Sequence, residues 1–222
     1  MGKLDVLQIK TSFLNYIQKT KRVNIIMDLR YSELHILPAK LPKTINEDFI
    51  ISNNKLSNLT NCPQKITGSF FCAENNISSL NGGPSYVGNS YNCSKNMLSN
   101  LEGAPEIICN EFICSLNDFL TSLAGCPKKI SIFKCYRSYN LTDISDLFNS
   151  EIDEVNMVIV KNMAVLPLAK FKLGFINSNY YPPILFQIIK KFDNNGSKEN
   201  IFAFQKSLIE NGFLDNARWC PE

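Results

Sequence analysis

The sequence predicts an α/β repeat solenoid, in which similar coils stack so that their strands form a parallel β-sheet and helices cover both ends. Three observations predict it. An aromatic residue recurs every 21 residues, an isoleucine or a cysteine follows two positions later, and an asparagine follows five positions after the first four aromatics. A fixed period of this length is the signature of supersecondary units that bury their apolar faces against one another. The aromatic residues are Phe49, Phe70, Tyr91, Phe112 and Phe133.

The first expected element is a helix over residues 4–21, within an N-terminal cap of residues 1–22. Leu4, Leu7, Phe13 and Ile17 lie on or near one face at helical spacing. That face would cover the open end of the first coil. The opening residues lack the long apolar core of a signal peptide, and no run approaches a membrane span. We therefore expect a cytoplasmic protein with no membrane partner.

Six coils are expected over residues 23–148, each with one short strand. Alternation across F-x-C turns the aromatic and the cysteine inward. The asparagine ends the strand, and its side-chain amide can bond backbone groups in the bend that would otherwise be buried without partners. A proline in most units disfavours a helix on the return path, so we expect extended segments there. The asparagines are Asn54, Asn75, Asn96 and Asn117, and the prolines are Pro63, Pro84, Pro105 and Pro127.

Residues 149–222 are expected to form a C-terminal capping region with two helices. A seventh strand is predicted near 155–160, followed by an extended segment over 167–176. Pro182 and Pro183 introduce the first helix, because proline is favoured at the first helical position. Ser197 is the predicted N-cap of the second helix, and Gly212 is its predicted stop.

The register L-x-L-x-x-N-x-L, with aromatics and cysteines in the first two apolar slots, resembles the leucine-rich repeat over residues 23–148. The short unit and the stretch FQKSLIENGFLDNARW, at 204–219, resemble repeat proteins of tailed bacteriophages. LPAKLP, at 37–42, is similar to the short repeats of secreted bacterial effectors that carry a ubiquitin-ligase domain. Residues 149–222 are too few for that catalytic domain.

The phage resemblance implies a viral protein in the cytoplasm of the host cell, which binds and modulates a host or defence protein. A structural or assembly role in the virion is one alternative. An effector-like role in a ubiquitin-type pathway is another.

The eight cysteines indicate packing rather than cross-linking or metal binding. Cys72, Cys93, Cys114 and Cys135 occupy the same slot of successive units. Adjacent strands lie about 4.8 Å apart, which exceeds the Cβ separation of about 3.8 Å that is typical of a disulfide. A single row also cannot surround a metal tetrahedrally. We expect reduced, buried thiols and neither a metal nor a cofactor.

No catalytic motif is evident, so we expect a protein that is not an enzyme. The single histidine has no partner at ligand spacing, and the chain lacks a phosphate-binding glycine loop and a nucleophile elbow. With 23 Lys and Arg against 20 Asp and Glu, the net charge of +3 is too small to indicate a nucleic-acid partner. The function class that these exclusions leave is a protein–protein interaction module. Its oligomeric state does not follow from the sequence.

The predicted binding face is the outward side of the strands, on the concave wall of the solenoid. Phe71, Ile113 and Leu116 have no structural reason to face water there, and contiguous exposed apolar residues mark interaction sites. Basic residues beside them are expected to steer an acidic partner. Two alternatives stay open, namely that flanking segments cover this face or that the C-terminal helices around Phe204 and Trp219 carry binding. The candidate residues are Ile50, Phe71, Glu74, Lys95, Ile113, Leu116, Lys134, Tyr136 and Arg137.

Overall fold

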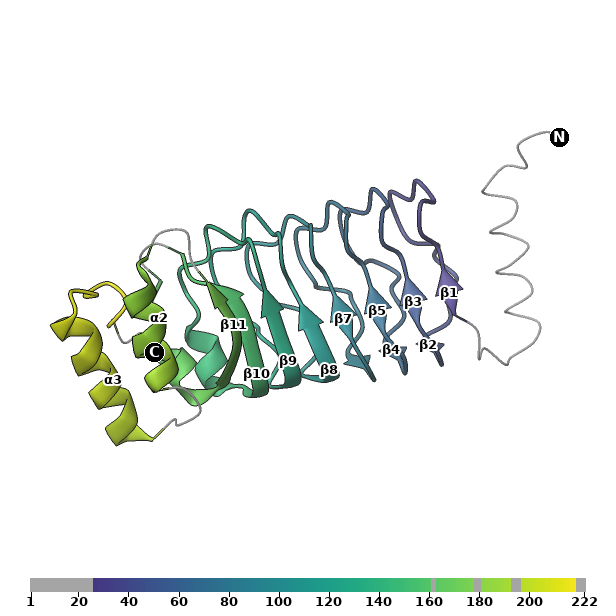
Figure 1. The fold of residues 1–222 in the computed structure, drawn as a ribbon. Coiled ribbons are helices and arrows are strands. Elements are labelled where there is room, and N and C mark those ends of the chain that lie inside the picture. Colours follow the sequence, from purple (N-terminus) through teal and green to yellow (C-terminus); the bar gives the residue numbers. More distant parts are fainter. Residues whose placement is uncertain (1–25, 161–162, 178–180, 193–196, 219–222) are drawn as a thin grey trace.

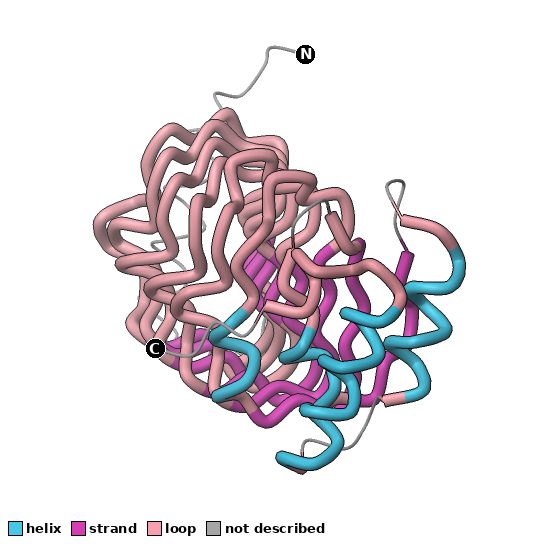
Figure 2. Tube along the Cα trace, turned by 90° about the vertical axis from the view of Figure 1, so that its left-hand side faces the viewer, coloured by secondary structure: helices cyan, strands magenta, loops and turns pink. Residues whose placement is uncertain are grey.

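The computed structural model describes residues 26–160, 163–177, 181–192 and 197–218. They form a parallel β-solenoid of about seven stacked coils, with two helices beyond its C-terminal end (Figure 1). Viewed along the stack, the strands occupy one side of each coil and extended return segments occupy the other (Figure 2). The predicted N-terminal helix, in residues 1–22, lies outside the described residues.

Each of the first coils contributes two short strands, where the sequence had predicted one. The predicted row consists of β1 (Met27–Asp28), β3 (Phe49–Ile50), β5 (Phe70–Phe71) and β7 (Tyr91–Asn92). A second parallel row consists of β2 (Thr44–Ile45), β4 (Lys65–Ile66) and β6 (Tyr86–Val87). The sequence signal for this second row was an aliphatic residue four positions before each of the first three aromatics. These residues are Ile45, Ile66 and Val87, and all three are buried.

The two rows merge as the solenoid proceeds. β8 (Ile107–Ile113), β9 (Lys129–Cys135) and β10 (Glu151–Val158) each run through both positions. Three residues separate Ile108 from Phe112, whereas two separate Ile130 from Phe133. β8 is nevertheless already continuous, so the shorter spacing in β9 does not cause the merger; it appears as a register shift between β8 and β9 at Ile108 and Glu111. β11 (Lys172–Asn177) pairs with β10 and completes an 11-stranded sheet. The predicted seventh strand is therefore β10, which begins earlier than expected.

The predicted aromatic column fills the core. Phe49, Phe70, Tyr91, Phe112 and Phe133 are fully buried. Their ring centroids follow one another at 5.7, 4.9, 5.5 and 6.1 Å. The cysteine column is buried beside it, and the cysteines of the described residues are free thiols.

The asparagines form a ladder that joins successive coils. The Nδ2 of Asn75 donates to the carbonyls of Ile51 and Cys72, at 3.0 and 3.1 Å. Its Oδ1 accepts from the backbone N–H of Leu56 at 3.0 Å. Asn96 repeats the pattern one coil later. Each amide thus satisfies buried backbone groups in two coils at once.

The C-terminal region holds two 3₁₀ turns, η1 (Ser145–Asn149) and η2 (Leu166–Lys170), and the helices α2 (Pro183–Lys191) and α3 (Lys198–Glu210). The two predicted helices are confirmed, and the Ser197 Oγ accepts from the backbone N–H of Asn200 at 3.2 Å. Gly212 stops α3 with a φ of +84°. The extended segment predicted over 167–176 is wrong in its first part, which forms η2. Pro167 sits in the first turn of η2, where a missing N–H costs nothing.

Candidate protein-binding surface

The outward side of β3, β5, β7, β8 and β9 carries one predicted residue from most coils, and we call it the strand face. Parallel register places Ile50, Phe71, Asn92, Ile113 and Lys134 side by side in a single row. Each of these side chains is partly exposed. The row is apolar at three of its five positions, namely Ile50, Phe71 and Ile113. These apolar side chains are therefore partly in contact with water instead of being buried in the core.

Glu74, Lys95, Leu116 and Arg137 form a second row, which we call the rim. Each directly precedes the ladder position of its coil, and each has a positive φ, from 54° to 60°. Side chains other than glycine rarely adopt this left-handed conformation, which costs roughly 1–2 kcal/mol. The ladder bonds fix the bend and so impose the strain. Its consequence is that the rim side chains leave the strand at a common angle.

Ion pairs neutralise most charges on and beside the strand face. Glu74 pairs with Lys95 at 3.2 Å and Glu111 with Lys134 at 2.6 Å. Glu154 pairs with Lys172 at 3.3 Å. Two of the lysines predicted to steer an acidic partner therefore already hold a carboxylate. Arg137 has no ion-pair partner among the described residues.

An exposed aromatic pair lies at the C-terminal end of the strand face. The rings of Tyr136 and Phe175 meet edge to face, with centroids 5.7 Å apart. Phe175 is 51% exposed. Tyr136 was a candidate from the sequence, but Phe175 was missed because its segment was assigned to the cap. The available signal was an aromatic next to a glycine within a strand, which is typical of a bulge.

A β-bulge positions Phe175. Gly174 and Phe175 of β11 lie opposite the single residue Asn156 of β10. The Oδ1 of Asn156 accepts from the backbone N–H of Phe175 at 2.6 Å, while its Nδ2 donates to Glu154 at 2.9 Å. A Cβ at position 174 would lie 2.4 Å from both the Asn156 amide oxygen and the Glu154 carboxylate. A larger residue here would displace the side chains of Asn156 and Glu154 that hold the bulge. Bulges of this kind re-aim the side chain that follows.

The charged groups around Tyr136 affect its hydroxyl. Burial raises the pKa of Tyr136, Lys134 opposes that shift, and Glu154 and Glu111 reinforce it. The phenol therefore stays protonated and can donate a hydrogen bond near neutral pH. Hydrogen bonds from Asn156 and Lys172 lower the pKa of Glu154, which keeps that carboxylate ionised.

Three further exposed apolar residues follow the ladder position of their coils, which is Asn96, Asn117 or Ser138, and sequence reasoning did not identify them. Met97, Phe119 and Tyr139 are 46%, 61% and 43% exposed, and they occupy corresponding turns of consecutive coils. The extra residue near Asp118 lies in this turn of the fourth unit.

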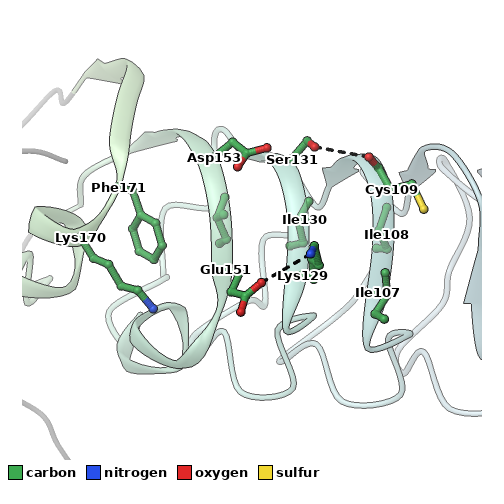
Figure 3. A pocket seen from close by; sticks show the side chains of 11 residues that line it. Ile107, Ile108, Cys109, Lys129, Ile130, Ser131, Glu151, Asp153, Lys170 and Phe171 are labelled. Atoms are coloured by element: carbon green, nitrogen blue, oxygen red, sulfur yellow. Dashed lines mark hydrogen bonds and ion pairs between the residues drawn. The ribbon is translucent and has the colours of Figure 1, made fainter. Parts of the chain in front are cut away.

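A groove of about 440 Å³ crosses the first halves of β8, β9 and β10 (Figure 3). Lys129 and Glu151 pair across it at 3.7 Å. The Lys170 ammonium donates to the carbonyls of Phe148 and Ser150, at 2.7 and 2.8 Å. Both lysines of the groove, Lys129 and Lys170, therefore already make intramolecular contacts. Within the described residues, no cluster of His, Cys, Asp and Glu could hold a metal ion.

Only part of the alternative binding site on the C-terminal helices lies within the described residues. Phe204 is fully buried and packs against Phe192, with ring centroids 5.4 Å apart. It is therefore a core residue of the cap and not a surface anchor. Trp219 lies outside the described residues. On the opposite side of α3, Phe202 and Ile209 are exposed.

None of the described helices has the length and apolar character needed to cross a membrane. In comparisons with known proteins, no family model, no curated protein and no solved structure matches this chain.

Proposed function

We propose that the protein is a non-enzymatic protein-binding module whose strand face contacts the partner. One observation carries this proposal: Ile50 lies beside Phe71 and Tyr136 meets Phe175, at least partly exposed, on the sheet surface that the solenoid does not need for its own packing. Contiguous surface of this kind is typical of interaction sites. Aromatic anchors supply a large share of interface energy.

The chemistry of the remaining sites supports a binding role over a catalytic one. Burial raises the pKa of Cys72 to about 12 and also raises the pKa of Cys93, so these thiols are poor nucleophiles. The lysines of the groove are held by a carboxylate or by backbone carbonyls. The hydroxyl of Ser131 in the groove donates to the backbone carbonyl of Cys109 at 3.3 Å.

We further propose that the coils are leucine-rich repeats and that residues 1–22 cap the first of them. The asparagine ladder supports the repeat assignment, because that position of the L-x-L-x-x-N-x-L register requires an amide with backbone partners in two coils. The resemblance of 204–219 supports a phage protein that acts on a host or defence protein in the host cytoplasm.

The test is a double variant of the strand face, Ile113→Glu with Tyr136→Ala. A matched control is Ile107→Glu with Tyr86→Ala, which changes the same residue types at exposed positions on the other strand row. Each tagged protein captures partners from a bacterial lysate for identification by mass spectrometry. We expect the strand-face variant to lose a partner that the control retains, at an unchanged melting temperature. Equal capture by both variants would rule out this face.

A further inference from the structure

We infer that the strand face binds an acidic, partly apolar segment of its protein partner, with a side-chain carboxylate on Arg137 and an apolar side chain against Tyr136 and Phe175. This inference rests on the proposed function and adds the chemistry of the partner. Three independent features carry it: the construction of the aromatic pair, the balance of charge and the apolar rim.

The aromatic pair is held by its surroundings rather than left over from the core. The bulge at Gly174 turns Phe175 outward, and Asn156 fixes that bulge through hydrogen bonds to Phe175 and Glu154. Phe175 is nevertheless 51% exposed. Bulges re-aim side chains next to functional sites, and an exposed edge-to-face pair offers a rigid apolar surface to a partner.

The charge balance defines the polarity of that partner. Glu74, Glu111 and Glu154 are each paired with a lysine from a neighbouring strand or coil. Of the cations on the strand face and rim, Lys95 and Lys134 hold a carboxylate, whereas Arg137, next to Tyr136 in the chain, has no ion pair among the described residues. A guanidinium binds carboxylates through two parallel hydrogen bonds. An acidic side chain is therefore the group that completes the surface.

The rim adds a second apolar contact beside the arginine. Leu116 occupies the equivalent position one coil earlier, and its backbone N–H donates to the carbonyl of Tyr136 at 2.8 Å. An apolar residue of the partner can thus reach both coils. A nucleic acid fits less well, because three carboxylates line the same face and one unpaired arginine cannot balance a phosphate chain.

The experiment is a selection of random 12-residue peptides, displayed internally so that carboxylates come only from Asp and Glu side chains. The full chain is the bait, and peptides recovered from it are synthesised for affinity measurement. We expect sequences with Asp or Glu beside an aromatic or aliphatic residue. Arg137→Gln should weaken their binding about tenfold or more, since a hydrogen bond to a charged group contributes about 1.5–3 kcal/mol. Arg30→Gln is the matched control, because Arg30 is an exposed arginine already paired with Asp28.

The outcomes separate this inference from the proposed function. Recovered peptides that lack carboxylates but still require Tyr136 would overturn the acidic-partner inference and leave the strand face as the binding surface. Peptides unaffected by both Arg137→Gln and Tyr136→Ala would count against the strand face itself. Failure to recover any peptide would overturn the inference, as would a single-stranded oligonucleotide that competes with the peptides at physiological salt.

Discussion

Tyr91 shows how a single residue is accommodated in a repeated core. Its hydroxyl lies near the Cys72 thiol, but among the described residues it is the buried side-chain polar atom without a hydrogen-bond partner. Gly83 faces it, and a Cβ there would come within 3.6 Å of that oxygen and 2.9 Å of both the Leu59 side chain and the Leu80 carbonyl. The equivalent position in other coils is Cys62 or Ala104. The hydroxyl oxygen of Tyr91 therefore lies next to glycine, the smallest residue found at this position of the coils.

Tyr91→Phe should leave stability unchanged or raise it by about 1 kcal/mol, because it removes a polar group that is buried without a partner. Urea unfolding measures the change. Phe112→Ala, one coil later in the same column, is the reference for a lost ring and should cost about 3–5 kcal/mol. A loss of more than about 1 kcal/mol in Tyr91→Phe would mean that the hydroxyl makes a stabilising hydrogen bond.

At the scale of elements, the asparagine ladder determines how one coil registers on the next. The Nδ2 of Asn96 donates to the carbonyls of Cys72 and Cys93, and its Oδ1 accepts from the backbone N–H of Ile77. The bend that allows these bonds holds the preceding residue, Lys95, at a φ of 54°. The ladder therefore stabilises the stack and also sets the direction of the rim side chains.

Asn96→Ala should lower the free energy of unfolding by about 2–4 kcal/mol, since buried backbone groups in two coils would lose their partners. Asn76→Ala is the control, because Asn76 lies one residue after the ladder position and is exposed. Denaturant midpoints of the two variants give the comparison. Equal midpoints would show that water replaces the amide.

The elements that the sequence predicted well are those with a local and periodic cause. The aromatic column and the two C-terminal helices follow from spacing, and Ser197 and Gly212 act as the cap and stop that their chemistry favours. The second strand row was missed because its strands are two residues long and carry a single buried aliphatic each. η2 was missed because the prediction treated residues 167–176 as one extended segment.

The candidate site depended on contacts that spacing does not encode. Tyr136 could be placed on an outward face by alternation, but its partner Phe175 reaches it only through the bulge opposite Asn156. Pairing of Lys134 with Glu111 joins residues from adjacent coils, whose side-chain directions depend on register. Such contacts require three-dimensional structure.

For the whole molecule, a row of buried thiols makes stability sensitive to alkali. Burial raises the pKa of Cys72 and Cys126 to about 12, and it also raises the pKa of Cys62 and Cys93. In the unfolded chain a thiol ionises near 8.5. Because the pKa is higher in the folded state, the stabilising contribution is complete below about pH 8.5 and is lost as the pH rises towards 12.

Each such thiol should remove about 1.4 kcal/mol of stability per pH unit above its unfolded pKa, and the contributions add. We therefore expect the urea midpoint to be flat from pH 7 to 8 and to fall steeply above pH 9. Cys72→Ala should lower the stability at neutral pH. It should also reduce the loss of stability per pH unit at alkaline pH by the contribution of one thiol. Cys109→Ser, which changes an exposed thiol, serves as the control. A midpoint that stays level to pH 11 would show that the thiols of the core ionise at the same pH in both states, and hence that the column is open to water.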